Sequence, residues 1–174
     1  MRTRHIGGIG GRPALALVPP LPDIDEHAAP TRTVTFCSHC GAEPPADAAI
    51  SPTRVCGDCG LGLLLQAQSD AAPGPGEAFV VADDSLSVCA VSAAAEQLLA
   101  TLETEAINQP ITRLLVPADA EGHGANLAAA MTWAARGDGA VHRTVVRPAN
   151  TFGIRITARI AACGPRSAAL LVFE

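Results

Sequence analysis

Tyrosine and lysine are absent from this 174-residue chain, and aromatic residues make up only 3% of it. All 12 basic residues are therefore arginine, which we interpret as a compositional bias and not as a sign of function. Charged residues are also scarce, at 17%, whereas hydrophobic residues reach 48%. A chain of this composition can bury a core, which argues against disorder along its whole length. The net charge of −5 argues against a protein that coats nucleic acid by electrostatics alone, although a local basic patch stays compatible with it.

Long apolar runs are missing as well. No stretch approaches the roughly 20 apolar residues of a membrane-spanning helix. The basic start is followed by an apolar run at residues 14–18, but flanking prolines confine this run to a length too short for a signal-peptide core. We therefore predict a cytoplasmic protein that does not enter a membrane. In a reducing compartment, clustered cysteines indicate a metal site rather than disulfides.

Composition divides the chain into four segments. Residues 1–33 carry glycine pairs and five prolines without a hydrophobic period, and we predict a disordered lead. Residues 34–68 hold a cysteine cluster, and residues 69–77 are rich in proline and glycine, which is typical of a linker. From residue 78 to residue 174 the hydrophobic pattern is regular, which predicts a second folded part.

The cysteine cluster has the spacing of a zinc site. Two Cys-x-x-Cys pairs are separated by fifteen residues, and the four candidate ligands are Cys37, Cys40, Cys56 and Cys59. Zn²⁺ prefers four ligands in a tetrahedron, and each pair offers two thiolates on one tight turn. Gly41 and Gly60 follow the second cysteine of each pair and allow the positive φ that such a turn needs. A ribbon this small buries little core, so the metal would supply its folding energy.

Two other interpretations of the cysteines are a redox pair and a loop held by disulfides, and both fit the spacing less well. His39 lies inside the first pair and could replace a ligand, but with four thiolates present we expect it to be exposed. A closed four-cysteine site leaves no coordination position for a substrate. We therefore predict a structural zinc ion and no zinc chemistry on a substrate.

The second part predicts an α+β fold. A hairpin of two strands is followed by a helix capped by Ser92, two short helices and a longer helix, and three strands end the chain. The predicted strands are Phe79–Ala82, Leu86–Val91, Val141–Arg147, Phe152–Ala161 and Ala168–Phe173; the predicted helices are Ala93–Ala100, Glu103–Ile107, Ile111–Leu115 and Ala125–Arg136. Strands on both sides of a helical middle predict an antiparallel sheet with helices on one face and water on the other.

This second part resembles a PAS domain over residues 78–173. The stretch Phe79–Leu99 is similar to the hairpin of that family and to its asparagine-x-alanine-alanine-glutamate helix. The stretch Glu105–Asp119 is similar to the family's isoleucine-glycine-lysine-proline motif and the helix that follows, and a longer helix with three strands completes the order. The resemblance implies a five-stranded antiparallel sheet with short helices cupped over one face. It also implies a domain that senses a small ligand, binds a cofactor or forms a homodimer.

Three positions depart from the family pattern. Ser92 stands where the family has asparagine, and both residues cap helices well. Asn108 stands in place of a glycine, and asparagine tolerates the left-handed conformation that this turn requires. Ala100 replaces another glycine, which predicts a looser or differently shaped turn.

Neither a flavin nor a haem is expected. The asparagine-cysteine-arginine motif of the family's flavin photosensors has no counterpart, and we interpret Cys89 and Cys163 as small buried residues on strands. Haem-binding members use a histidine from the helical side. His142 points into the cup if its arginine neighbours face water, but we interpret it as a core or rim residue, and His123 as a solvated loop residue.

Two surface features remain open. If the strands that carry Arg143, Arg147, Arg155 and Arg159 form a hairpin, their outer face is basic, which suits either ordinary solvation or an acidic partner. Trp133, the one tryptophan, lies off the apolar stripe of its helix, which suits partial burial or a dimer or ligand contact.

The sequence therefore predicts a regulatory signalling protein and not an enzyme. It offers no nucleophile–base pair, phosphate loop or carboxylate pair, and no kinase, cyclase or helix-turn-helix output. We predict a structural zinc ribbon joined to a PAS-like domain that binds a small molecule or a protein partner. The alternative is a transcription-associated protein whose ribbon binds nucleic acid or the transcription machinery. Direct nucleic-acid binding is not expected, because residues 41–55 offer only Arg54 against Glu43 and Asp47.

Overall fold

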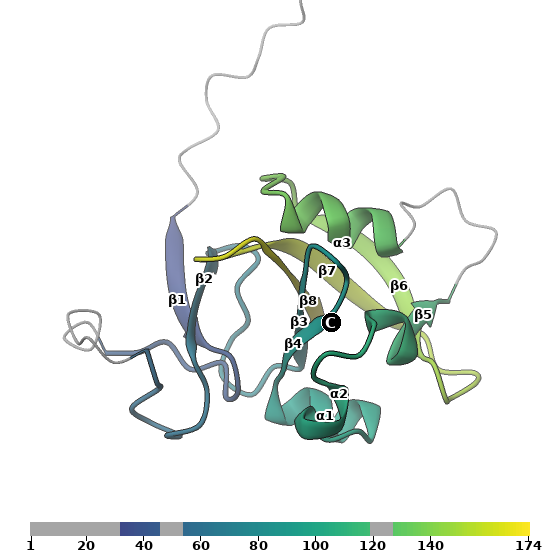
Figure 1. Ribbon diagram of the computed structural model, residues 1–174, viewed down its shortest axis with the longest axis horizontal. Helices are drawn as coiled ribbons and strands as arrows, with labels where there is room; N and C mark the ends of the chain where they lie inside the picture. Colours follow the sequence, from purple (N-terminus) through teal and green to yellow (C-terminus); the bar gives the residue numbers. More distant parts are fainter. Residues whose placement is uncertain (1–31, 46–53, 119–126) are drawn as a thin grey trace, which may run out of the picture. The chain divides into compact units, whose positions relative to one another are not determined.

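The computed structural model describes residues 32–45, 54–118 and 127–174, and the strands among them form two antiparallel sheets (Figure 1). The smaller sheet pairs β1 (Thr33–Cys37) with β2 (Leu64–Gln68). The larger sheet has the strand order β4-β3-β8-β7-β6-β5. Its strands are β3 (Phe79–Asp83), β4 (Val88–Val91), β5 (Leu115–Pro117), β6 (His142–Pro148), β7 (Ile156–Cys163) and β8 (Ala168–Phe173). The predicted combination of an antiparallel sheet with a few helices is confirmed.

The larger sheet has six strands where five were predicted. The additional strand is β5, which pairs with β6 from Leu115↔Pro148 to Pro117↔Val146. The sequence predicted a helix at Ile111–Leu115, but only a single 3₁₀ turn, η2 (Ile111–Arg113), forms there. Proline cannot donate a ladder hydrogen bond, and Pro117 is tolerated because β5 is an edge strand.

The start of the predicted strand Phe152–Ala161 was wrong. β7 begins at Ile156, and the segment before it closes the hairpin with β6, with Gly153 at φ 80°. Phe152 begins the apolar alternation of the predicted strand, but it is 84% exposed, and the guanidinium of Arg147 lies 5.0 Å from its ring centroid. The apolar alternation continued across the turn, so periodicity alone could not separate turn from strand.

The helices begin and end close to the predicted positions. In α1 (Ala93–Leu99) the hydroxyl of Ser92 accepts a hydrogen bond from the backbone N–H of Ala95, which confirms the predicted cap. Ala100 ends α1 with φ 50°, so the turn keeps a left-handed shape without glycine, at a cost of about 1–2 kcal/mol. Asn108 follows α2 (Glu103–Ala106) and has the predicted left-handed conformation at φ 63°. The last helix is α3 (Leu127–Ala135), and none of the helices in the described part of the chain has the length and apolarity needed to cross a bilayer.

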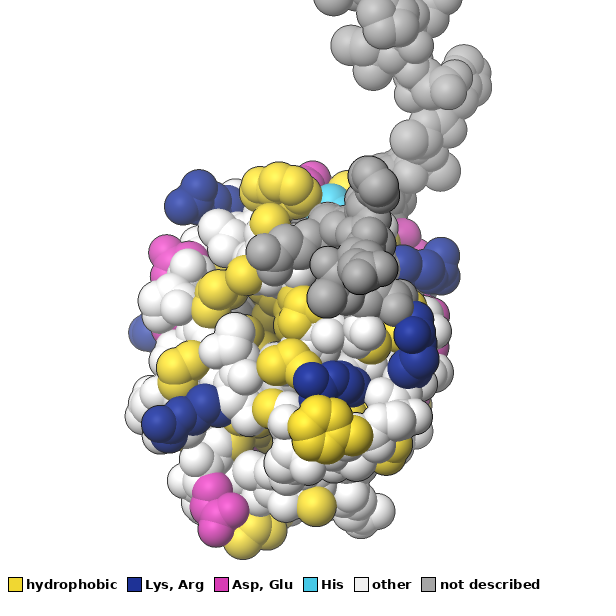
Figure 2. All heavy atoms as spheres, turned by 90° about the vertical axis from the view of Figure 1, so that its right-hand side faces the viewer, with side chains coloured by type: hydrophobic (Ala, Val, Ile, Leu, Met, Phe, Trp, Pro, Cys, Tyr) yellow, Lys and Arg dark blue, Asp and Glu magenta, His cyan; other side chains and the backbone are white. Residues whose placement is uncertain are grey.

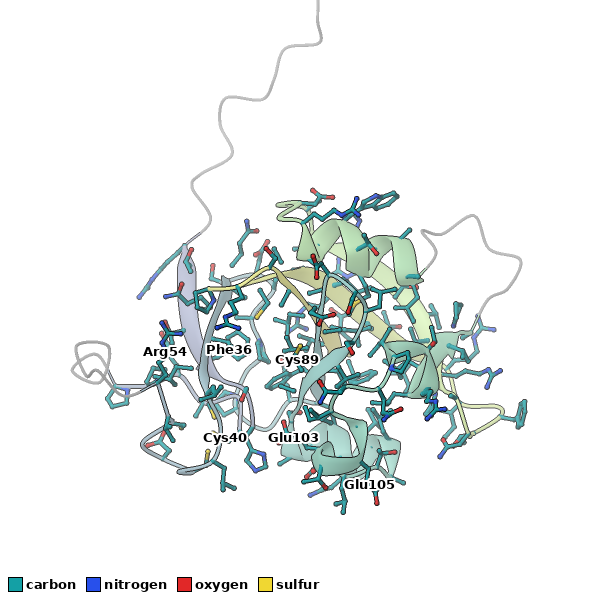
Figure 3. The ribbon with its side chains drawn as sticks, viewed as in Figure 1. Phe36, Cys40, Arg54, Cys89, Glu103 and Glu105 are labelled. Atoms are coloured by element: carbon teal, nitrogen blue, oxygen red, sulfur yellow. The ribbon has the colours of Figure 1, made fainter. Side chains whose placement is uncertain are left out.

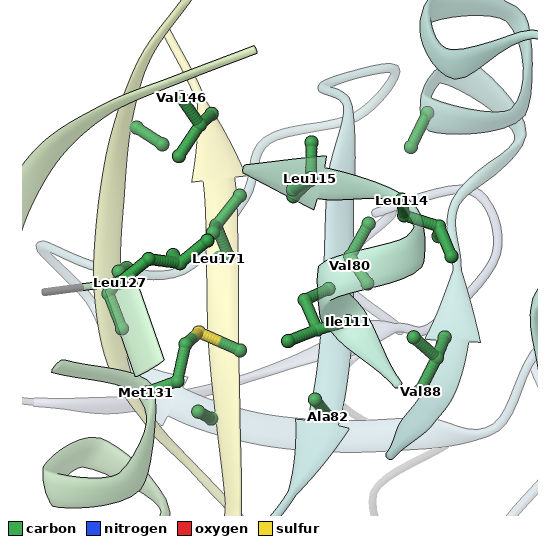
Figure 4. Packing of buried hydrophobic residues seen from close by; sticks show 14 of the residues in the cluster. Val80, Ala82, Val88, Ile111, Leu114, Leu115, Leu127, Met131, Val146 and Leu171 are labelled. Carbon is green, nitrogen blue, oxygen red and sulfur yellow. The ribbon is translucent and has the colours of Figure 1, made fainter. Parts of the chain in front are cut away.

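One face of the larger sheet packs against the helices. Leu127 and Met131 from α3 and Ile111 from η2 are fully buried against Leu171 and Val80 of the sheet (Figure 4). All three α-helices contribute alanine or leucine side chains to this same cluster. Aliphatic side chains of the chain itself therefore pack between the described helices and the sheet.

Part of the opposite face of the sheet is covered by the small β1–β2 sheet, which together with its cysteine turns we call the ribbon (described residues 33–45 and 54–68). Phe36 of β1 packs edge-on against Phe79 of β3, with ring centroids 5.6 Å apart, and both rings are buried. Leu170 and Val172 belong to the same cluster. The prediction that this face would be wet is thus wrong for the centre of the sheet. The described residues belong to one compact unit, Thr31–Glu174.

Backbone and side-chain contacts fix the ribbon to the sheet. Gln66 and Gly164 exchange two backbone hydrogen bonds of 3.1 and 2.8 Å, which join β2 to the end of β7. Residues 69–77, whose composition is typical of a linker, contain no helix or strand, and Arg159 of β7 donates hydrogen bonds to the carbonyls of Ala71 and Ala72 in this segment.

Candidate metal centre

Two matching turns present the four cysteines. In the first turn the backbone N–H of Gly41 donates to the carbonyl of Cys37, and in the second the N–H of Gly60 donates to that of Cys56, each over 3.0 Å. Gly41 and Gly60 have φ values of 73° and 70°, as the sequence predicted. A side chain in this conformation would strain the turn, so the glycines allow both cysteines of a pair to face the same point.

The four sulfur atoms form a compact cluster, with every pair within 4.8 Å. The Sγ atoms of Cys37 and Cys59 are 3.6 Å apart, and those of Cys40 and Cys56 are 4.0 Å apart. A tetrahedron with Zn–S bonds of about 2.3 Å has edges of about 3.8 Å. The donor set and its spacing therefore fit a metal ion such as zinc. The cluster contains the four cysteines and not the ring of His39. We predicted that His39 would be exposed, but it is half-buried.

Burial and backbone amides have opposite effects on the thiols. Burial raises the pKa of Cys37 to about 12 in the absence of a metal. Hydrogen bonds from the backbone of Gly62 and Leu61 lower the pKa of Cys59 to about 6. The backbone N–H of His39 also points to the Sγ of Cys37, 3.4 Å away. Amides directed at sulfur stabilise thiolates, the form in which cysteine binds metal.

Gly62 is also needed for the geometry of the site, although the sequence did not predict this role. A methyl group at this position would overlap the Sγ of Cys37 and the backbone nitrogen of His39. The second turn can therefore approach the first only because residue 62 has no side chain. The pattern Cys59-Gly-Leu-Gly62 carried the signal, but glycine there is equally compatible with a simple turn.

We expect Gly62→Ala to weaken zinc binding about 10- to 100-fold, as displacement of groups next to metal ligands does elsewhere. Gly57→Ala is the matched control, because a methyl group at Gly57 meets nothing within 4 Å. Competition with a chromophoric chelator measures both variants against the wild type. Equal zinc affinity in Gly62→Ala and Gly57→Ala would contradict the close approach at residue 62.

The first turn of the centre is tied to the second part of the chain, and the sequence had left open whether the two parts touch. The carbonyl of His39 accepts a hydrogen bond of 2.9 Å from Ala93 N at the start of α1. The carbonyl of Cys40 accepts one of 3.1 Å from Gly76 N. Movement of this turn would therefore disturb both α1 and residues 69–77.

Within the described residues, the remaining sulfur and histidine candidates take no part in this centre. Cys163 is buried as predicted, but the prediction for Cys89 was wrong, since it is exposed on β4. His142 lies at the rim, where its Nε2 is 3.0 Å from a carboxylate oxygen of Asp138 and its ring centroid is 5.9 Å from that of Trp133. His123 lies outside the described residues. A histidine that pairs with Asp138 and whose ring lies tilted at 47° to that of Trp133 matches the predicted rim role.

The predicted basic face does not form one patch. Arg143 lies directly opposite Arg159 on β6 and β7, and both approach the carboxylate of Glu174. Arg159 also forms an ion pair of 2.9 Å with Glu77, and Arg147 covers the ring of Phe152. On the face shown in Figure 2, basic side chains are spread out with apolar side chains between them. The acidic neighbours of Arg143 and Arg159 support ordinary solvation there.

No protein-family model matches the chain, and no curated protein shows significant similarity to it.

Proposed function

We propose that the chain is a non-catalytic regulatory protein in which a zinc-stabilised ribbon and a PAS-like sheet together form a platform for protein partners. The order of elements supports a PAS-like arrangement, because a strand hairpin leads through short helices and one longer helix to three strands. The central position of β8, flanked by β3 and β7, fits the same arrangement. No catalytic residues are assigned.

The observation that carries the proposal is the ribbon on the outer face of the sheet. Phe36 and Ala67 of the ribbon share a buried cluster with Phe79, Leu170 and Val172 of the larger sheet. The ribbon and the larger sheet therefore have a hydrophobic core in common. The helix side is occupied by side chains such as Met131 and Leu171. A small-molecule sensor needs space on that side, whereas an interaction domain does not, and this favours protein binding over ligand sensing.

Zinc has a structural role in this proposal. Four cysteine sulfurs complete the tetrahedral coordination, so a bound ion would have no position for water or substrate. The ion would hold the two turns together and, through His39 and Cys40, fix their contacts with the sheet-bearing part.

Metal analysis and native mass spectrometry of the full chain, purified without added cofactor, test the proposal. We expect one zinc ion per chain, no other bound mass and no visible absorption band. A small molecule that co-purifies in stoichiometric amount would contradict the preference for protein binding and identify a sensor. Absence of zinc, with the four cysteines oxidised, would contradict the structural metal site and indicate thiol redox chemistry.

A further inference from the structure

A groove of about 490 Å³ lies between the ribbon and the face of the sheet that the helices do not cover. Leu63 and Leu65 form its wall on the ribbon, and Val81 and Ala90 line it from β3 and β4. The turn between β7 and β8, which includes Arg166, closes another side. The groove exists because the ribbon covers only part of this face, and Figure 3 labels Arg54 on the ribbon side and Cys89 on the sheet side.

The apolar surface continues beyond the groove. Leu63 pairs with Val55 in an isolated antiparallel bridge, and both side chains are exposed. Leu61, beside the second cysteine turn, is also exposed. Through its pairing with Leu63, Val55 extends the apolar lining of the groove onto the exposed surface of the ribbon. Exposed apolar surface of this kind marks interaction sites, and its extension beyond the groove suits a polypeptide better than a small molecule.

The charges at the groove favour an acidic occupant. Arg54 and Arg166 line it, and both are exposed. Neither has an ion-pair partner within the described segments of the chain. Among the described residues that line the groove, Asp83 is the one carboxylate, and its Oδ1 already accepts hydrogen bonds from Ser85 and Ser87. The two guanidinium groups are therefore available to a carboxylate from outside.

The negative charge of Asp83 does not remove the preference of the groove for an acidic occupant. Burial acts to raise its pKa, but the hydrogen bonds from Ser85 and Ser87 outweigh that effect and lower the pKa below its ordinary value. The carboxylate is thus ionised at neutral pH and engaged in its own turn. With two arginines and one carboxylate among its described lining residues, this lining has a positive balance in a chain whose overall net charge is −5.

We propose that this groove binds a peptide segment of a partner protein that carries aliphatic side chains next to a carboxylate. The proposal rests on the proposed function and adds the surface and the chemistry of the partner. Aliphatic side chains would cover the exposed Leu63 and the half-buried Leu65, and the carboxylate would pair with Arg54 or Arg166.

Selection from a random dodecapeptide display library on the zinc-loaded full chain tests the groove. We expect enriched peptides to combine aliphatic and acidic residues. Fluorescence anisotropy then gives the Kd of the enriched peptides for groove variants. Arg54→Glu with Arg166→Glu should weaken binding about tenfold or more, because it turns two attractive charges into repulsive ones. Arg113→Glu with Arg136→Glu is the control with the same change of charge at exposed sites outside the groove.

A second pair of variants tests the apolar part of the groove. Leu63→Ser in the groove should weaken binding, whereas Leu102→Ser should not, although the two leucines are 54% and 57% exposed. Zinc content verifies that each variant keeps the ribbon. Failure to enrich any peptide, or binding equally sensitive to the control variants, would overturn the groove proposal. Displacement of the peptides by dodecanoate at stoichiometric concentration would overturn it in favour of a small amphiphile. These outcomes leave the proposed function to its separate metal and mass test.

Discussion

Removal of zinc with a chelator is expected to unfold the ribbon and to lower the stability of the sheet that the ribbon covers. Structural zinc sites in small peptides contribute about 10–16 kcal/mol of apparent binding free energy at neutral pH, so loss of the ion would remove a large part of the stability of the two cysteine turns. Phe36 and Ala67 would leave the cluster that they share with Phe79, so the effect would extend beyond the metal site. Circular dichroism during thermal unfolding, and hydrogen exchange resolved along the sequence, would detect both parts of the change.

Cys56→Ser tests the same result by mutation. Cys56 is buried and lies in the sulfur cluster, so we expect its loss to abolish stoichiometric zinc binding and to mimic chelation. Cys89→Ser is the control, because Cys89 is exposed and lies outside the cluster. A Cys56→Ser protein that retains one zinc ion and the wild-type Tm would show that the four sulfurs do not act as one site.

Arg159→Ala is expected to lower the free energy of unfolding by about 3 kcal/mol. The guanidinium donates to the carbonyls of Ala71 and Ala72 at 3.3 and 3.1 Å and pairs with Glu77 at 2.9 Å. Its side chain is only 14% exposed. Hydrogen bonds to charged groups contribute about 1.5–3 kcal/mol each, and truncation would leave several partners without a donor.

Arg143→Ala provides a close comparison. Arg143 lies directly opposite Arg159 in the sheet and approaches the same Glu174, but at 3.7 Å and with 71% of its side chain exposed. Exposed ion pairs contribute about 0–1 kcal/mol, so this variant should differ little from the wild type. Urea unfolding of both variants measures the difference. Equal losses would indicate that Arg159 acts through general charge and not through the contacts it makes to residues 71–77.

The sequence was most informative where chemistry is local. The spacing of the cysteines indicated the ligand set because two residues between thiols suit one tight turn, and the glycines after each pair allow its positive φ. Ser92 was identified as a cap because its hydroxyl reaches an amide only three residues away. In both cases the geometry of the individual turn or cap depends on residues only a few positions apart, so spacing and residue type indicate it.

Contacts between distant segments could not be predicted in the same way. The hydrogen bonds of Arg159 to Ala71 and Ala72 join residues far apart in the chain, and an arginine on a strand gives no sign of such partners. The same holds for Phe36, whose burial depends on Phe79. The groove forms because the ribbon extends over only part of the sheet, and the hydrophobic pattern of the sequence does not predict that extent.

The paired hydrogen bonds between Gln66 and Gly164 have an evolutionary consequence. They use backbone atoms only, so nearly any residue except proline could stand at position 66. The number of residues between Cys59 and Gln66, by contrast, is constrained. One inserted residue would turn Leu65 and Ala67 to the opposite side of β2 or pull Cys59 away from the other sulfurs. Homologues of this chain should therefore conserve the number of residues between the metal site and β2 more strictly than the identities of those residues.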